Sequence, residues 1–93
     1  DEYRAVFQKV LVPAADAFKP EFVIISAGFD AHRDDPLASM GLTEEGYADL
    51  TNIVAGIARQ HCQGRLLSAL EGGYNLTALA ASVERHIQAL VAA

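Results

Sequence analysis

The apolar positions along the chain predict three helices. Between Tyr3 and Phe18 they fall on one helical stripe, and Pro13 within it predicts a kink or a break because proline removes a backbone donor. The same spacing predicts helices over residues 43–60 and 76–91. Thr43 is expected to cap the first of these, with acidic residues in the first turn where the helix dipole favours negative charge.

Two short apolar runs between these helices predict strands, at residues 22–27 and 66–70. Neither run alternates with polar residues, which is typical of strands covered on both faces in a parallel sheet. The expected fold is therefore α/β, in the order α-β-α-β-α, with a mostly parallel sheet flanked by helices. Parallel strands end at the same edge of a sheet, so the loops 28–37 and 71–75 are expected side by side.

Composition restricts the partners that this chain is expected to have. Its 93 residues make one domain or a piece of one, and the net charge of −5 argues against a nucleic-acid partner. No apolar stretch is long enough to cross a bilayer, so no membrane partner is expected. The single cysteine, Cys62, excludes an internal disulfide and a cysteine-rich zinc motif, and it suits a cytoplasmic location.

Residues that can bind a metal follow the first predicted strand. Asp30 comes just after Gly28, and its carboxylate either serves as a metal ligand or caps its own turn. His32 lies two residues further on, so both side chains can face one way in an extended segment. His61 and His86 lie on the predicted helices and are expected to be solvated or interfacial rather than ligands.

Two further aspartates precede Pro36 in a composition typical of turns. Asp34 is expected to be an ordinary hydrogen-bonded loop residue, with Arg33 or His32 as its charge partner. Asp35 is a candidate for orienting the loop or an imidazole behind a metal ligand.

A tyrosine at the end of the second predicted strand has two alternative roles. Tyr74 follows Gly72 and Gly73, and a hydroxyl presented by such a loop can donate a hydrogen bond to a developing oxyanion. Alternatively, Tyr74 packs at the start of the last helix, with Asn75 as the helix cap. The spacing alone leaves both alternatives open.

Three motifs carry a resemblance to a known family: "SAGFDAHRDDPL" at residues 26–37, "GLTEEGYADLT" at 41–51 and "LEGGYNL" at 70–76. In this order they resemble the C-terminal part of the zinc-dependent histone deacetylase family. The likeness is greatest to class II enzymes and to bacterial deacetylase-like and acetylpolyamine amidohydrolases. The family has the arginase-deacetylase fold, a mostly parallel sheet flanked by helices, which agrees with the order predicted above.

The resemblance implies a role in amide hydrolysis for several residues. It makes Asp30 one ligand of a catalytic zinc, and Tyr74 the donor that polarises the acetyl carbonyl and stabilises the oxyanion. Gly72 and Gly73 would shape the loop beside an acetylated lysine or acetylpolyamine substrate, and Leu37 would line the substrate channel. His32 is not a ligand in the family, and with Asp35 it would steady the loop behind Asp30.

The chain lacks other parts of the family's site. It has no adjacent histidine pair to serve as general base and no upstream Asp-x-His pair of zinc ligands. Residues 1–93 are therefore expected to be a C-terminal fragment of a deacetylase catalytic domain, inactive alone, and to form a homo-oligomer through exposed sheet edges and apolar surface. The alternative is a non-catalytic α/β interaction module that keeps the fold. A phosphoacceptor role for Asp30 is weakly supported, since the lysines lie in or at the end of the first helix.

Overall fold

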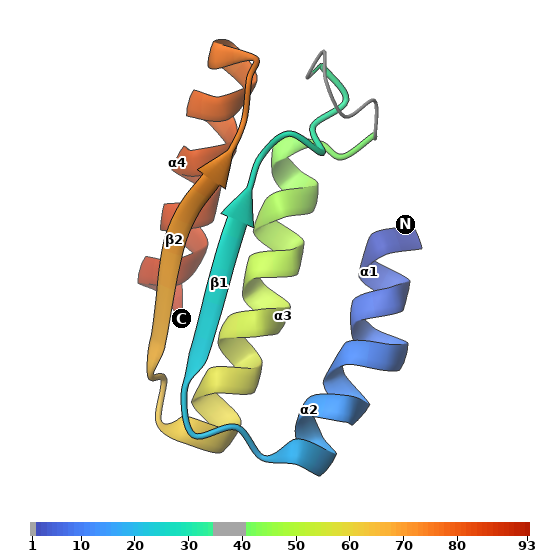
Figure 1. Ribbon diagram of the computed structural model, residues 1–93, viewed down its shortest axis with the longest axis vertical. Coiled ribbons are helices and arrows are strands. Elements are labelled where there is room, and N and C mark those ends of the chain that lie inside the picture. Colours follow the sequence, from blue (N-terminus) through green and yellow to red (C-terminus); the bar gives the residue numbers. More distant parts are fainter. Residues whose placement is uncertain (1, 35–40) are drawn as a thin grey trace.

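The chain alternates helices and strands in the predicted order (Figure 1). The computed structural model describes residues 2–34 and 41–93. The elements are α1 (Glu2–Val6), the π-helical η1 (Phe7–Leu11), α2 (Val12–Phe18), β1 (Val23–Gly28), α3 (Glu44–Cys62), β2 (Leu66–Gly72) and α4 (Leu76–Ala92). The α/β prediction is confirmed, with the first three segments forming one helical region.

Of the kink or break expected at Pro13, the break does not occur. Residues on both sides of it are helical, and the irregularity is η1, a π-helical stretch that ends two residues before the proline. Pro13 itself is the second residue of α2, directly after η1. Lys19 ends α2 in a left-handed conformation (φ 57°), and its N–H donates to the Ala15 carbonyl at 2.8 Å.

The two strands form a parallel pair, as predicted. Pairing runs from Val23 opposite Leu66 to Gly28 opposite Gly72, with a shift in register between Ala27 and Gly28. Because both strands run in one direction, they end at the same edge of the sheet. Helices α3 and α4 also begin at this edge, so two strand ends and two helix N-termini meet there (Figure 1).

The prediction that the strands are covered on both faces is wrong for the chain as it stands. Helices α3 and α4 pack against each other and behind the strands in Figure 1. On the opposite face, Ile24 is 70% exposed and Leu67 is 54% exposed. The described part of the chain supplies helices for one face only, and this leaves an apolar surface on the other.

Both predicted helix caps are present. The Thr43 hydroxyl accepts a hydrogen bond from the Gly46 N–H at 3.1 Å, and the Asn75 side-chain oxygen accepts one from the Ala78 N–H at 2.9 Å. Each satisfies a donor that the first helical turn leaves without an intrahelical partner. These caps fix where α3 and α4 begin, immediately beside the two strand-end loops.

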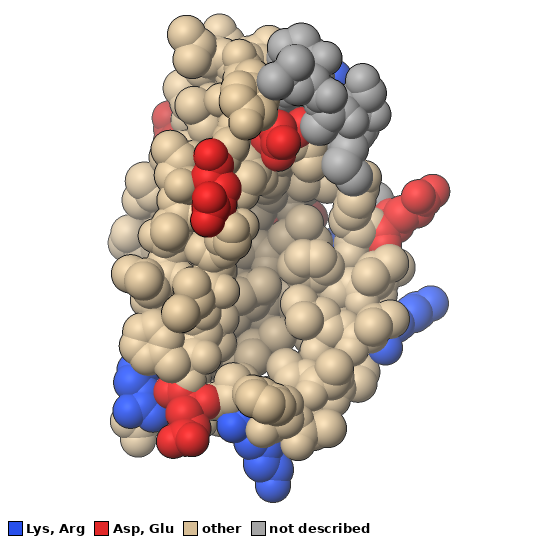
Figure 2. Space-filling model, viewed as in Figure 1, with Lys and Arg blue, Asp and Glu red and all other residues tan. Residues whose placement is uncertain are grey.

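An apolar groove of about 710 Å³ lies between the leading helical region and β1 with α3. It is visible as the hollow at the centre of Figure 2. Its lining includes Phe7, Phe22, Ile25 and Leu50, and every residue of β1 contributes to it. Strand β1 pairs with β2 alone in the described part of the chain, so its other edge opens toward this groove. In the described residues, no helix combines the length and apolarity needed to cross a membrane.

Candidate functional site

The loops that follow the two strands lie side by side, as the parallel topology predicts. The Phe29 N–H donates to the Gly72 carbonyl at 2.7 Å, directly after the last strand pair. Phe29 is itself buried and belongs to the core cluster with Tyr47. The core therefore lies directly beneath the loop that carries Asp30.

Asp30 and Tyr74 converge on one small space beside Gly72. A Cβ atom on Gly72 would lie 3.5 Å from the Tyr74 hydroxyl oxygen and 3.7 Å from the Asp30 carboxyl carbon. Glycine at this position leaves that space open, because any larger residue would place a side chain between the two groups. The structure thus brings together the carboxylate and the hydroxyl singled out from the sequence.

Gly73 has a different structural role from Gly72. Its φ of +147° is one that L-residues with a side chain rarely adopt. A Cβ there would lie 2.7 Å from Leu79 Cδ1 and 3.3 Å from Phe29 Cβ, both side chains of the protein itself. Gly73 therefore lets the loop pack closely on α4 and on the residue that follows β1, and its contact with substrate stays a prediction.

In the tyrosine loop, Asn75 and Tyr74 have different structural roles. Asn75 is the helix cap, and its side-chain NH₂ also donates to the Asp34 carbonyl at 3.0 Å, which joins the two loops. Tyr74 is 55% exposed, so it is not packed into the start of α4. Its hydroxyl is on the side of Asp30, the position that a donor to a substrate carbonyl would need.

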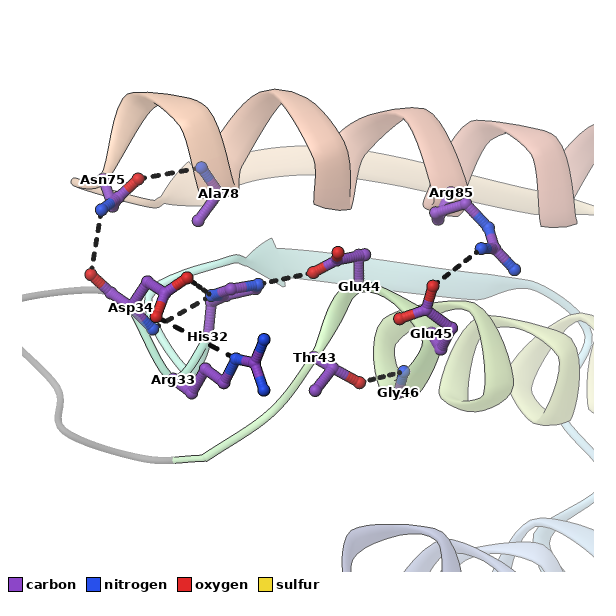
Figure 3. Close-up of polar contacts among 10 residues, drawn as sticks. All are labelled: His32, Arg33, Asp34, Thr43, Glu44, Glu45, Gly46, Asn75, Ala78 and Arg85. Atoms are coloured by element: carbon purple, nitrogen blue, oxygen red, sulfur yellow. Dashed lines mark hydrogen bonds and ion pairs between the residues drawn. The ribbon is translucent and has the colours of Figure 1, made fainter.

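His32 is buried, with only 3% of it exposed, and its ring contacts polar groups on two sides (Figure 3). Its Nε2 lies 2.7 Å from Glu44 Oε2, and its Nδ1 accepts the Asp34 N–H at 3.1 Å. The Asp34 carboxylate also lies near both of its predicted charge partners, 3.9 Å from His32 Nδ1 and 4.0 Å from Arg33 Nε. The ring thus sits inside the turn that follows Asp30.

Glu44 is the residue of this cluster that sequence analysis missed. The sequence predicted Glu44 only as an acidic residue of a first helical turn. It lies twelve residues from His32, and this separation does not indicate a contact. The hydrogen bond from His32 lowers the pKa of Glu44 below its ordinary value, and a backbone hydrogen bond at its own N–H adds to the effect. Glu44 is accordingly ionised at neutral pH and is a strong acceptor.

Two of the predicted site residues, Asp35 and Leu37, lie outside the described residues. Their proposed parts in orienting the loop and in lining a substrate channel therefore stay predictions.

The described residues do not by themselves form a metal centre. They contain no group of three histidine, cysteine, aspartate or glutamate side chains placed to hold an ion. A catalytic zinc needs three protein ligands and an open position. Asp30 fits as one such ligand, since its carboxylate lies at the sheet edge beside Gly72, and the other ligands would have to come from further residues.

The other two histidines lie away from this cluster. His86 is buried rather than solvated: its ring lies between α3 and β2, 2.8 Å from both Thr51 Oγ1 and Ser68 Oγ. His61 is half-buried at the contact of α3 with α2, and its Nε2 lies 2.7 Å from Asp16 Oδ1. Both are interfacial, and neither contributes to the site at the strand ends.

Comparison with known proteins finds one family match over nearly the whole chain. The family described as the histone deacetylase domain matches residues 1–90. Histone deacetylase 15 of Arabidopsis thaliana is 46% identical over 90 residues, which cover 97% of this chain and 16% of that protein. The histone deacetylase-like amidohydrolase of Pseudomonas aeruginosa is 37% identical over 75 residues, or 81% of this chain and 20% of that protein.

Solved structures of deacetylases have the same fold in the matching region. The crystal structure of the HDA15 HD domain superposes with a TM-score of 0.85 at 46% identity, over 97% of this chain and 24% of that one. The structure of the histone deacetylase Clr3 gives a TM-score of 0.87 at 36% identity, over 97% of this chain and 14% of that one. The chain thus spans about a quarter or less of these structures.

Proposed function

Because this chain belongs to the histone deacetylase family, we propose that its two strand-end loops form one wall of an amide-hydrolysing active site. The observation that carries the proposal is the convergence of the Asp30 carboxylate and the Tyr74 hydroxyl beside Gly72. The chain forms part of a deacetylase domain, and its fold agrees with the solved deacetylase structures.

Tyr74 would act as the hydrogen-bond donor of the reaction. Its side chain is exposed at the sheet edge, so its O–H can reach the carbonyl oxygen of a bound acetyl amide. The same hydrogen bond strengthens as the carbonyl carbon becomes tetrahedral and its oxygen becomes an anion. Tyr74 therefore stabilises the transition state more than it stabilises the bound substrate.

Asp30 would hold the catalytic zinc of the complete enzyme as one of its ligands. Zinc, when bound, supplies Lewis-acid polarisation of a carbonyl and lowers the pKa of water. Since the described residues place only one ligand at the strand ends, the remaining ligands and the general base would come from elsewhere in the complete enzyme. The 93-residue chain alone is thus expected to be inactive.

Acetylated lysine or acetylpolyamine amides are the proposed substrates. The names of the relatives support this class: two are a histone deacetylase and a deacetylase-like amidohydrolase. Gly72 would leave room for the acetyl group. Gly73 and Leu37 would border the aliphatic part of the substrate to which the acetyl group is attached.

Self-association and a cytoplasmic location are further proposals for the isolated chain. The exposed apolar face with Ile24 and Leu67, together with the open edge of β1, supports association with a second copy. Light scattering that gives the mass of a monomer at all concentrations would contradict it.

A chimera tests the proposed chemistry. In it, residues 1–93 replace the matching part of the HDA15 HD domain, a replacement that the TM-score of 0.85 makes structurally conservative. Tyr74→Phe removes only the hydroxyl, and kcat for an acetyl-lysine peptide should fall about 100-fold or more. Tyr3→Phe, which removes the same atom from a side chain that lines the apolar groove, is the matched control and should change kcat less than about twofold. A folded, zinc-loaded chimera without activity, or one unaffected by Tyr74→Phe, would contradict the proposal.

A further inference from the structure

The turn that carries Asp30 is closed at its base by backbone hydrogen bonds. The Leu42 N–H donates to the Ala31 carbonyl at 2.9 Å, and the Arg33 N–H donates to the Leu42 carbonyl at 2.7 Å. His32, between the two, is the bridge partner of Leu42. These bonds fix the start of the turn relative to the segment that leads into α3.

The His32 ring, in one defined tautomer, links the turn to the first residue of α3. Its Nδ1 accepts a hydrogen bond from the Asp34 N–H at 3.1 Å, so that nitrogen carries no proton. The ring proton is therefore on Nε2, which donates to Glu44 Oε2 at 2.7 Å (Figure 3). The ring itself is buried, whereas the Glu44 side chain is 35% exposed, so the ring end of this contact is the part shielded from water.

Glu44 is itself held in place by its position in α3. It is the first residue of the helix, directly after the cap Thr43, where the helix dipole stabilises a carboxylate. On the opposite side, Asn75 at the start of α4 donates to the Asp34 carbonyl at 3.0 Å. The Asp30 turn is thus held between the N-termini of two helices.

We propose that Glu44 is a positioning residue, which acts through the His32 ring to fix the Asp30 carboxylate relative to the Tyr74 hydroxyl. This inference rests on the proposed function, because it gives Glu44 a task in orienting a zinc ligand and an oxyanion donor. Glu44 contacts the His32 ring, which accepts the Asp34 N–H, so it would act through the turn that His32 supports.

Glu45 provides a matched control in the next position of the same helix. It carries the same charge, lies in the same first turn and pairs with Arg85 at 3.2 Å in an exposed contact. Removing Glu45 changes the net charge and the helix-dipole interaction as removing Glu44 does. Of these two glutamates, only Glu44 contacts the His32 ring.

The first test uses the 93-residue chain and nuclear magnetic resonance. Ring ¹⁵N shifts should show the Nε2–H tautomer of His32 in the unsubstituted chain and in Glu45→Ala. In Glu44→Ala the ring should exchange between tautomers, and the Asp34 amide should exchange with water about tenfold faster or more. Glu44→Gln keeps an acceptor oxygen and should retain the tautomer, with intermediate amide exchange. If Glu44→Ala does not fold, exchange of the Asp34 amide in Glu44→Gln decides. Faster exchange than in the unsubstituted chain supports the inference, and equal exchange contradicts it.

The second test uses the zinc-loaded chimera. Glu44→Ala should weaken zinc affinity about 10- to 100-fold, as loss of groups that orient ligands commonly does, and Glu44→Gln should restore most of it. Equal affinities and equal His32 spectra for Glu44→Ala and Glu45→Ala would overturn the inference. An unsubstituted chimera that binds zinc but hydrolyses no acetyl amide would instead overturn the proposed function, so the two failures are distinguishable.

Discussion

The Thr51 hydroxyl lies 2.8 Å from Nδ1 of His86, and this contact determines where the ring proton resides. Thr51 uses its one proton to donate to the Tyr47 carbonyl at 2.7 Å, so toward His86 it can only accept. Nδ1 therefore carries the proton, and Nε2 accepts from the Ser68 hydroxyl at 2.8 Å. A neutral ring thus joins α4 to α3 and β2 with both nitrogens satisfied.

His86 makes the stability of the fold depend on pH. Burial lowers the pKa of His86 below its ordinary value of 6.5, so the unfolded chain binds a proton more readily than the folded one. The stabilisation from the neutral ring is complete above about pH 6.5 and is lost as the pH falls toward the lowered pKa. Urea unfolding at about pH 7.5 and about pH 5.5 should show a lower midpoint at the acidic pH.

The His86→Gln variant isolates this effect, since His32 and His61 remain in both proteins. Its urea midpoint should fall less between the two pH values than that of the unsubstituted chain. An equal fall would assign the pH dependence to other groups.

Substitutions of two glycines should separate backbone strain from crowding. Gly64 has φ +78° with no atom near its missing Cβ, so Gly64→Ala should lower the free energy of unfolding by about 1 kcal/mol. Gly73 combines φ +147° with a Cβ position 2.7 Å from Leu79, and Gly73→Ala should cost about 3 kcal/mol or more. Denaturant titration measures both, and equal losses would show that contact with Leu79 adds nothing.

Local sequence signals predicted the elements of this fold and where its site lies. Helical spacing, the caps at Thr43 and Asn75, and the two apolar runs predicted five elements in order, and parallel pairing placed Asp30 beside Tyr74. These signals work because each depends on a few neighbouring residues or on a topological rule for parallel strands.

Contacts between residues far apart in the chain could not be predicted from the sequence, because they depend on packing. Glu44 has the composition of an ordinary first helical turn, and only the folded turn brings it to His32. The His86 ring contacts two hydroxyl groups instead of solvent, and this depends in the same way on how α4 packs on α3 and β2. The π-helical stretch η1 before Pro13 is a third case, since proline specifies a lost donor but not how the helix accommodates it.

Ser82 offers a test of the packing of α4. It is 0% exposed, and its hydroxyl has no hydrogen-bond partner among the described residues. Because a buried hydroxyl without a partner is destabilising, Ser82→Ala should raise the free energy of unfolding by up to about 1 kcal/mol. Thr51→Val, which removes a hydroxyl with two partners, should lower it by about 1–3 kcal/mol. A loss of stability in Ser82→Ala would contradict this assignment.

Metal retention separates what this chain does alone from what it contributes to a complete site. After zinc loading and dialysis, the 93-residue chain should retain far less than one zinc per chain, because one carboxylate does not hold a catalytic zinc. The chimera should retain zinc and lose it on Asp30→Asn, whereas Asp34→Asn, in the same loop, should leave it bound, since that carboxylate points to Arg33 and His32. Stoichiometric zinc in the isolated chain, lost on Asp30→Asn, would instead mean that a neighbouring copy or His32 completes the site. The expected inactivity of the chain would then have to be tested directly with an acetyl-lysine substrate.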